Sequence, residues 1–230
     1  MIFARNLVIA VALAVLFSSP SAWAADDLQR VLHELDVAAA NFHSTSADFE
    51  FDSNVTDPIP DKDVQKGTVY YERKGTGFQM AAHIREVNGK QVPKIYTMVG
   101  GSFQLYEPMI DQLITSQKVS QYASYLELGF GASGKDLAEK WNIKYLGPET
   151  IDNVKTEKLE LVAKDPAVLK YFSKVTVWLD TSRAVSLKQY FDEGQGASRV
   201  CFYFNIKVNE AIAPDEFKIK TDSKTQFVRQ

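Results

Sequence analysis

The stretch RVCFYFNIKVN (199–209) decides the fold class, because its residues alternate in character. Side chains of a β-strand point to opposite faces with a period of two. The stretch therefore predicts a strand with an apolar and a polar face. The apolar face meets either a packed core or an apolar ligand, and it consists of Val200, Phe202, Phe204, Ile206 and Val208.

Ten further segments show the same strand character. The pair Asn88-Gly89 separates two of them and is a strong hairpin signal. Short strands at regular spacing favour an antiparallel sheet, here of about eleven strands. The ten segments are 46–53, 67–74, 77–86, 92–101, 102–107, 140–147, 154–163, 174–180, 184–192 and 216–220.

Helical patterns interrupt the strands. Residues 26–42 place apolar residues at steps of three and four, which predicts an amphipathic helix. Residues 118–130 carry a weaker stripe, and SGKD (133–136) resembles a capping box before a short helix through Lys140. In 165–172, Asp165 and Pro166 indicate a further helical turn.

A sheet this long within one domain curls, and its concave face offers a place for helices with one apolar side. We therefore expect a mainly β fold with helices: an unclosed, strongly curved antiparallel β-barrel of about eleven strands, covered by a helical lid or plug.

The first residues predict secretion. Arg5 precedes an apolar run (7–17), and Ala22-Trp23-Ala24 has the form of a signal peptidase site. We expect residues 1–24 to be a cleaved signal peptide and residues 25–230 to form a single soluble domain. No cysteine lies near the cut, and a single cysteine (Cys201) gives no internal disulfide. The net charge of −3 gives no reason to expect a nucleic-acid partner.

The sequence offers little for catalysis. It has no HExxH, CxxC, P-loop or GxSxG motif, and His33, His43 and His83 are scattered. Cys201 has no histidine on the neighbouring predicted hairpin to act as its base. We therefore expect no enzyme activity, no catalytic residue, no bound metal and no cofactor.

Arg73 is the polar residue that stands out. By strand parity it shares a face with Val69 and Tyr71. A guanidinium on an apolar face is costly unless it is hydrogen-bonded. Arg73 therefore either finds buried partners or, being at a strand end, reaches water.

The order and spacing of these segments resemble the LolA-type periplasmic lipoprotein carriers and the related outer-membrane lipoprotein-sorting proteins. The resemblance covers nearly the whole chain after residue 24. It is carried by LQRVLHELDVAAANFHSTSADFEF (28–51), GTVYYERK (67–74), VGGSFQLYEP (99–108), ITSQKVSQYASYLELGFGASGKDLAEKWNIKYLG (114–147), VTVWLDTSRAVSLKQYFDEGQ (175–195) and FNIKVNEAIAPDEFKIK (204–220).

The resemblance implies an unclosed barrel whose apolar interior holds acyl chains beneath helices. It makes Arg73 the latch of the lid, although Lys74 follows here where the best-known carriers have Pro. From strand parity and the resemblance we expect the lipid-binding cavity to be lined by Phe49, Phe51, Val69, Tyr71, Phe78, Met80, Ile95, Phe103, Leu105, Phe202, Phe204 and Ile206.

The function implied is that of a monomeric periplasmic carrier that shuttles lipoproteins, or related lipids, toward the outer membrane. Its partners would be the acylated cargo, an inner-membrane releasing complex and an outer-membrane acceptor. The alternative is a regulatory module that senses lipids or lipoproteins. An anchored receptor would need a cysteine after the signal, which is absent, and an enzyme on this scaffold would need a polar cluster inside the barrel.

Overall fold

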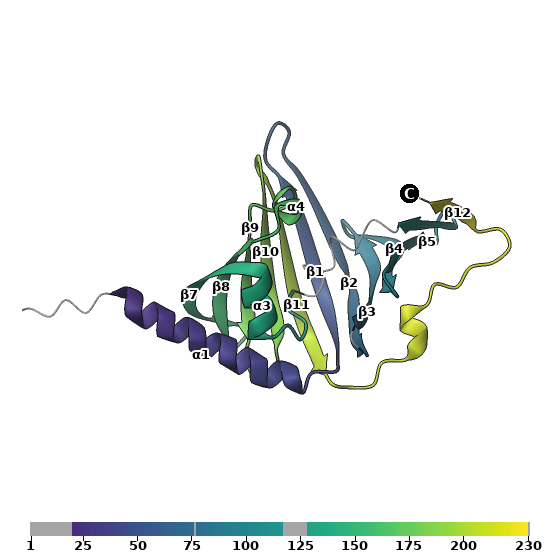
Figure 1. Cartoon of the computed structure of the whole chain (residues 1–230). Coiled ribbons are helices and arrows are strands. Elements are labelled where there is room, and N and C mark those ends of the chain that lie inside the picture. Colours follow the sequence, from purple (N-terminus) through teal and green to yellow (C-terminus); the bar gives the residue numbers. More distant parts are fainter. Residues whose placement is uncertain (1–19, 76, 117–127, 230) are drawn as a thin grey trace, which may run out of the picture.

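The computed structural model describes residues 20–75, 77–116 and 128–229, with side chains from Asp26 onward. These residues contain one strongly curved, unclosed sheet of 12 strands, ordered β12-β6-β5-β4-β3-β2-β1-β11-β10-β9-β8-β7 (Figure 1). The expected open curved barrel is confirmed. The strands are β1 (Ser44–Val55), β2 (Asp61–Lys74), β3 (Gly77–Val87), β4 (Lys90–Val99), β5 (Ser102–Glu107), β6 (Gln112–Ser116), β7 (Trp141–Ile151), β8 (Val154–Ala163), β9 (Lys174–Asp180), β10 (Val185–Gly194), β11 (Ala197–Val208) and β12 (Gln226–Arg229).

The described helices are α1 (Pro20–Ala40), α3 (Gly134–Lys140), α4 (Pro166–Leu169) and the 3₁₀ turn η2 (Pro214–Phe217). Both predicted caps are present: the Ser133 hydroxyl accepts from the Asp136 amide at 3.0 Å, and Asp165 caps α4. Of the helix expected over 118–130, residues 118–127 lie outside the described part, and 128–130 form a turn and a bridge instead.

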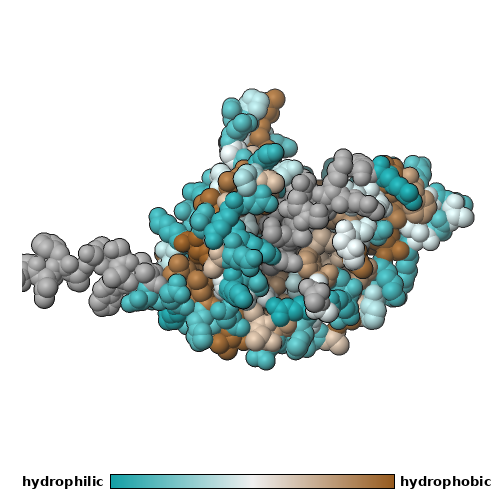
Figure 2. Space-filling model, in the orientation of Figure 1, coloured by the Kyte–Doolittle hydropathy of each residue, from teal (hydrophilic) through white to brown (hydrophobic). Residues whose placement is uncertain are grey.

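One end of the sheet is a filled core. In Figure 1, α1 and α3 lie across one face of β7–β10. Val31 and Leu35 of α1 and Leu137 of α3 are buried there against Leu159 and Val177. Figure 2 shows a mostly hydrophilic surface over α3 with hydrophobic patches around it. This helix-covered core holds α1 in place. The apolar face that the sequence predicts for residues 26–42 is buried in it.

The second core belongs to the middle of the sheet. Phe42, just after α1, and Phe130 pack onto the inner faces of β1–β4, β10 and β11. The Phe130 ring lies 5.0 Å from Tyr203, nearly perpendicular to it, and stacks at 6.1 Å on Tyr71. These aromatic contacts join the helix-bearing side of the molecule to β2.

The predicted orientation of β11 is wrong for part of the strand. Cys201 is buried and Tyr203 packs in the second core, whereas Phe202 and Phe204 are 36% and 41% exposed on the opposite face. The register against β1 shifts between Ser46 and Asp48, and Asn205 has a φ of +52°. This bulge reverses the alternation, so only the later residues Ile206 and Val208 point inward as expected.

Three strand assignments also differ. Residues 216–220 are not a strand, because Pro214 begins the turn η2, which buries Phe217 and packs on β3 and β4. Two strands, β6 and β12, were not predicted, and β12 pairs parallel to β6. Within the described residues, no helix combines the length and apolar character that crossing a membrane requires.

Candidate functional site

Arg73 lies at the end of β2 and bonds to backbone on two other segments. Its Nη1 donates to the carbonyl oxygens of Ala39 at 2.6 Å and Phe42 at 3.0 Å, at the end of α1. Its Nη2 donates to the carbonyl of Gly131 at 2.5 Å. The guanidinium carbon also lies 5.5 Å from the centre of the Phe42 ring. Of the two possibilities for Arg73, buried partners or water at the strand end, the first is realised. Its guanidinium is hydrogen-bonded to partners on the inner side of the sheet.

The segment 128–132 is fixed to the sheet next to Arg73. The Gly131 amide donates to Ala184 and the Ser186 amide to Gly129, both at 2.8 Å, and the Gln189 side chain donates to the Leu128 carbonyl. Gly131 has a φ of +71°, and a Cβ there would collide with the Phe42 ring. Glycine is therefore required where this segment passes the Phe42 ring.

α1 is also held near its middle by a buried carboxylate. Glu157 on β8 is 3% exposed, and it accepts from Arg30 at 3.2 Å and from the Tyr145 hydroxyl at 2.6 Å. Burial, together with this bond to Glu157, raises the pKa of Tyr145 to about 12. α1 is thus bonded to the sheet both near its middle and, through Arg73, at its end.

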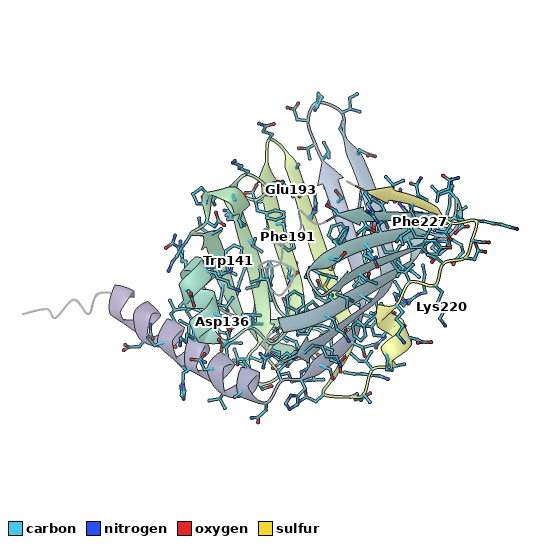
Figure 3. All side chains as sticks on the ribbon, turned by 45° about the vertical axis from the view of Figure 1, so that its right-hand side comes forward. Asp136, Trp141, Phe191, Glu193, Lys220 and Phe227 are labelled. Carbon is cyan, nitrogen blue, oxygen red and sulfur yellow. The ribbon has the colours of Figure 1, made fainter. Side chains whose placement is uncertain are left out.

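A cavity of about 420 Å³ opens beside Arg73, between the ends of β2 and β3 and the segment leading into α3. Its size falls in the range of ligand pockets, about 300–1,000 Å³. Figure 3 shows Asp136 and Trp141, two of its lining residues, at α3 and at the start of β7. The lining combines aromatic and aliphatic side chains with charged and glycine positions: Tyr71, Phe78, Leu128, Phe130, Ala132, Leu137, Trp141, Arg73, Asp136, Lys140, Gly75, Gly77 and Gly131.

The structure separates the twelve predicted cavity residues into four groups. Tyr71 and Phe78 line the cavity. Phe49, Val69 and Met80 are buried in the second core, and Phe51, Phe103 and Ile206 pack against that core. Leu105 pairs with Tyr96, which places it on the same inner face. Ile95, Phe202 and Phe204 lie on the other face, and for them the expectation was wrong.

The outer face has its own aromatic contacts. Trp178 lies directly opposite Lys158 and Lys188 on the neighbouring strands, whose ammonium groups are 4.7 and 4.5 Å from its ring. Lys188 also lies 5.2 Å from the Phe202 ring. Cation–π contacts and lysine stems accompany these rings, and Trp178 is buried on this face without a cavity.

Sequence reasoning missed several lining residues, chiefly those of 128–141. The capping box at 133–136 is the signal that located α3, and a helix start beside an apolar run could have drawn attention to Leu137 and Trp141. Phe130 lies in a stretch whose pattern predicts a helix, and the structure places it in an isolated β-bridge with Val185 instead.

The described residues hold no group of histidine, cysteine and carboxylate side chains that could bind a metal ion. Cys201 is buried, and burial raises the pKa of its thiol to about 12, which keeps it protonated. The arrangement leaves a partly open cavity lined by aromatic, aliphatic and polar groups, and it offers no activated nucleophile among the described residues.

No family model and no curated protein matches the sequence. Solved structures do match. An uncharacterized conserved protein from Thermus thermophilus aligns with a TM-score of 0.56 at 10% identity, over 89% of this chain and 99% of that one. MucB aligns with a TM-score of 0.55 at 14% identity, over 88% of this chain and 66% of that one.

A LolA superfamily protein from Nitrosomonas europaea matches with a TM-score of 0.40 at 17% identity, over 84% of this chain and 97% of that one. At these identities a likeness concerns the fold and not the activity. The unclosed curved sheet with helices over one face, shared with the Thermus protein and MucB, is the LolA-like fold that the sequence resembles.

Proposed function

We propose that the protein binds the acyl chains of lipoproteins, or of related lipids, and carries them through the periplasm toward the outer membrane. The observation that carries the proposal is the cavity of about 420 Å³ beside Arg73, with aromatic residues from β2, β3 and 128–141 around it. The LolA-like fold supports it at the level of lipid or lipoprotein binding.

The physical need for such a carrier is large. Exposing an acyl chain to water costs about 0.8 kcal/mol per methylene, or roughly 12 kcal/mol for sixteen carbons. A carrier must offer an equivalent apolar surface when loaded and cover it when empty. A segment that fills the groove in the absence of cargo meets both requirements, and Phe130 in the second core is placed to do so.

In this proposal Arg73 is the latch of the empty state. Its bonds to Ala39, Phe42 and Gly131 join β2 to the end of α1 and to segment 128–132. Because α1 is also bonded through Arg30 and Glu157, we propose that opening moves the β2–β3 end away from the helices. Cargo then shifts the equilibrium by its greater affinity for the open form, and a stronger acceptor removes it.

The test is to purify the protein from its native cell envelope and identify co-purifying molecules by mass spectrometry. Acylated peptides or lipids at near-stoichiometric amounts are expected, and an Arg85→Leu variant, changed on the outer face, should carry the same load. Protein that is consistently empty when it lacks residues 1–24 would contradict the proposal.

A second candidate is a module that senses lipid or lipoprotein and reports it to another protein. The observation favouring it is the match to MucB, a protein that has also been solved as a complex with MucA. A lipid-dependent gain or loss of a co-purifying protein partner would favour the sensor, whereas transfer of cargo to acceptor membranes would favour the carrier.

A further inference from the structure

The cavity beside Arg73 has a positive balance of charge among its described lining residues. Arg73 and Lys140 are cationic, and Asp136 is the acidic member. The bonds of Arg73 run to backbone carbonyls, which carry no formal charge, and no described carboxylate pairs with it. An anion in this cavity would therefore meet a guanidinium whose charge is not yet neutralised.

The geometry of Arg73 leaves donors for such an anion. A guanidinium has five N–H groups. Three of them serve Ala39, Phe42 and Gly131, and the other two have no partner within the part of the chain that the structure describes. A carboxylate accepts two N–H bonds from one guanidinium, and hydrogen bonds of this charge-assisted kind are roughly twice as strong as neutral ones.

The volume limits the apolar part of the ligand. An engineered protein cavity of about 150 Å³ holds benzene, with its six carbons. On that scale a cavity of about 420 Å³ holds roughly 17 non-hydrogen atoms. That is one long acyl chain with its head group. The three chains of a triacylated lipoprotein would need the cavity to expand about threefold.

We propose that the ligand of this cavity is a single-chain anionic amphiphile of the fatty-acid class, with its carboxylate on Arg73 and its chain along Tyr71, Phe78 and Trp141. The inference rests on the proposed function and narrows it to one chemical class of cargo.

The test compares three probes with the same twelve-carbon chain, dodecanoate, dodecanol and dodecylammonium, each below the concentration at which it self-associates or separates from water. Calorimetric titration of the delipidated protein should show dodecanoate binding at least tenfold more tightly than dodecanol, and dodecylammonium most weakly. Affinity should rise about fourfold for each added methylene and level off near sixteen carbons, where the cavity is full.

Arg73 variants separate the charge from the latch. Dodecanoate and dodecanol share their chain, so any change in opening alters both affinities equally, and their ratio reports on the head group alone. Arg73→Leu should reduce this ratio tenfold or more. Arg73→Lys keeps the charge and should retain most of the ratio, and Lys170→Gln, which removes a cation outside the cavity, should leave it unchanged.

The position of the chain is tested by fluorescence. Dodecanoate brominated on its chain should quench Trp141, and Trp141→Phe should lose that quenching while Trp178 on the outer face stays unaffected.

Equal binding of dodecanol, an unchanged ratio in Arg73→Leu, or preference for a synthetic triacylated lipopeptide over dodecanoate would overturn this inference and leave the proposed function intact. Failure to bind any of these probes would overturn both.

Discussion

Replacing Arg73 with leucine should loosen the junction between β2, the end of α1 and segment 128–132. The side chain makes hydrogen bonds of 2.6, 3.0 and 2.5 Å to three carbonyls. A bond to a charged group contributes about 1.5–3 kcal/mol. Because the three bonds share one side chain they do not add in full, and we expect a loss of about 3 kcal/mol in the free energy of unfolding.

Urea denaturation measures the total loss, and amide hydrogen exchange localises it. Exchange should accelerate at the amides of Phe42, Arg73 and Gly131, which bond to Ala39, His43 and Ala184. The matched control is Arg85→Leu on the outer face of β3. Its side chain is 56% exposed, bonds to Thr68 and Asp48, and should contribute less than about 1 kcal/mol. Equal losses for both variants, with no local change in exchange, would refute the latch geometry.

The Arg73→Leu substitution should also change the affinity of the protein for its cargo. If opening is needed to admit a bulky ligand, destabilising the closed form by about 3 kcal/mol raises the apparent affinity by up to roughly a hundredfold. Arg73→Leu should therefore retain such cargo longer and slow its transfer to acceptor vesicles in a fluorescence assay. Unchanged transfer would remove Arg73 from the mechanism.

Three further predictions test the packing and ionisation described above. Gly134→Ala places a Cβ too close to the Leu32 carbonyl oxygen, so α1 and α3 must separate. Thermal denaturation should show a loss of about 1–3 kcal/mol in the free energy of unfolding. An unchanged melting temperature would contradict that contact. Cys201, with its thiol pKa near 12, should react with a thiol reagent at pH 8 only in urea, and rapid labelling of the native protein would show that the thiol is accessible. The raised pKa of Tyr145 means that the fold favours the neutral phenol, so its contribution to stability is full below pH 10 and is lost as the pH rises toward about 12. Urea midpoints between pH 9 and 12 should thus fall more steeply for the parent than for Tyr145→Phe, and parallel curves would count against the bond to Glu157.

The periodicity of the sequence predicted most of the sheet, because alternation along a strand is a local property. It misassigned the inward face of β11 because both faces carry aromatic residues. Phe202 lies beside Lys188 on a neighbouring strand, and Tyr203 contacts Phe130, about seventy positions earlier in the chain. Neither contact can be inferred from the sequence of one strand alone. β12 was missed for a similar reason, since its parallel partner β6 is distant in sequence.

Of the candidate site, Arg73 could be predicted from the sequence, but the groups around it could not. Arg73 stood out because a charge on an apolar face needs partners, and its partners are three backbone carbonyls. Carbonyls carry no sequence signature, so neither the end of α1 nor Gly131 could be assigned to Arg73 from residue types. The role of Arg73 as a latch stays a prediction, as do the cut after Ala24, which falls within α1, and the single domain over 25–230.

The two margins of the sheet have a consequence for the protein at high concentration. An open sheet invites strands of other molecules to add to its edges and to build filaments. Here β12, at one margin, has only four residues, and β7, at the other, is interrupted by a bulge between Tyr145 and Gly147 and by Pro148, which lacks an amide hydrogen. Filament growth by strand addition needs two long, regular margins, and neither margin of this sheet is both long and regular.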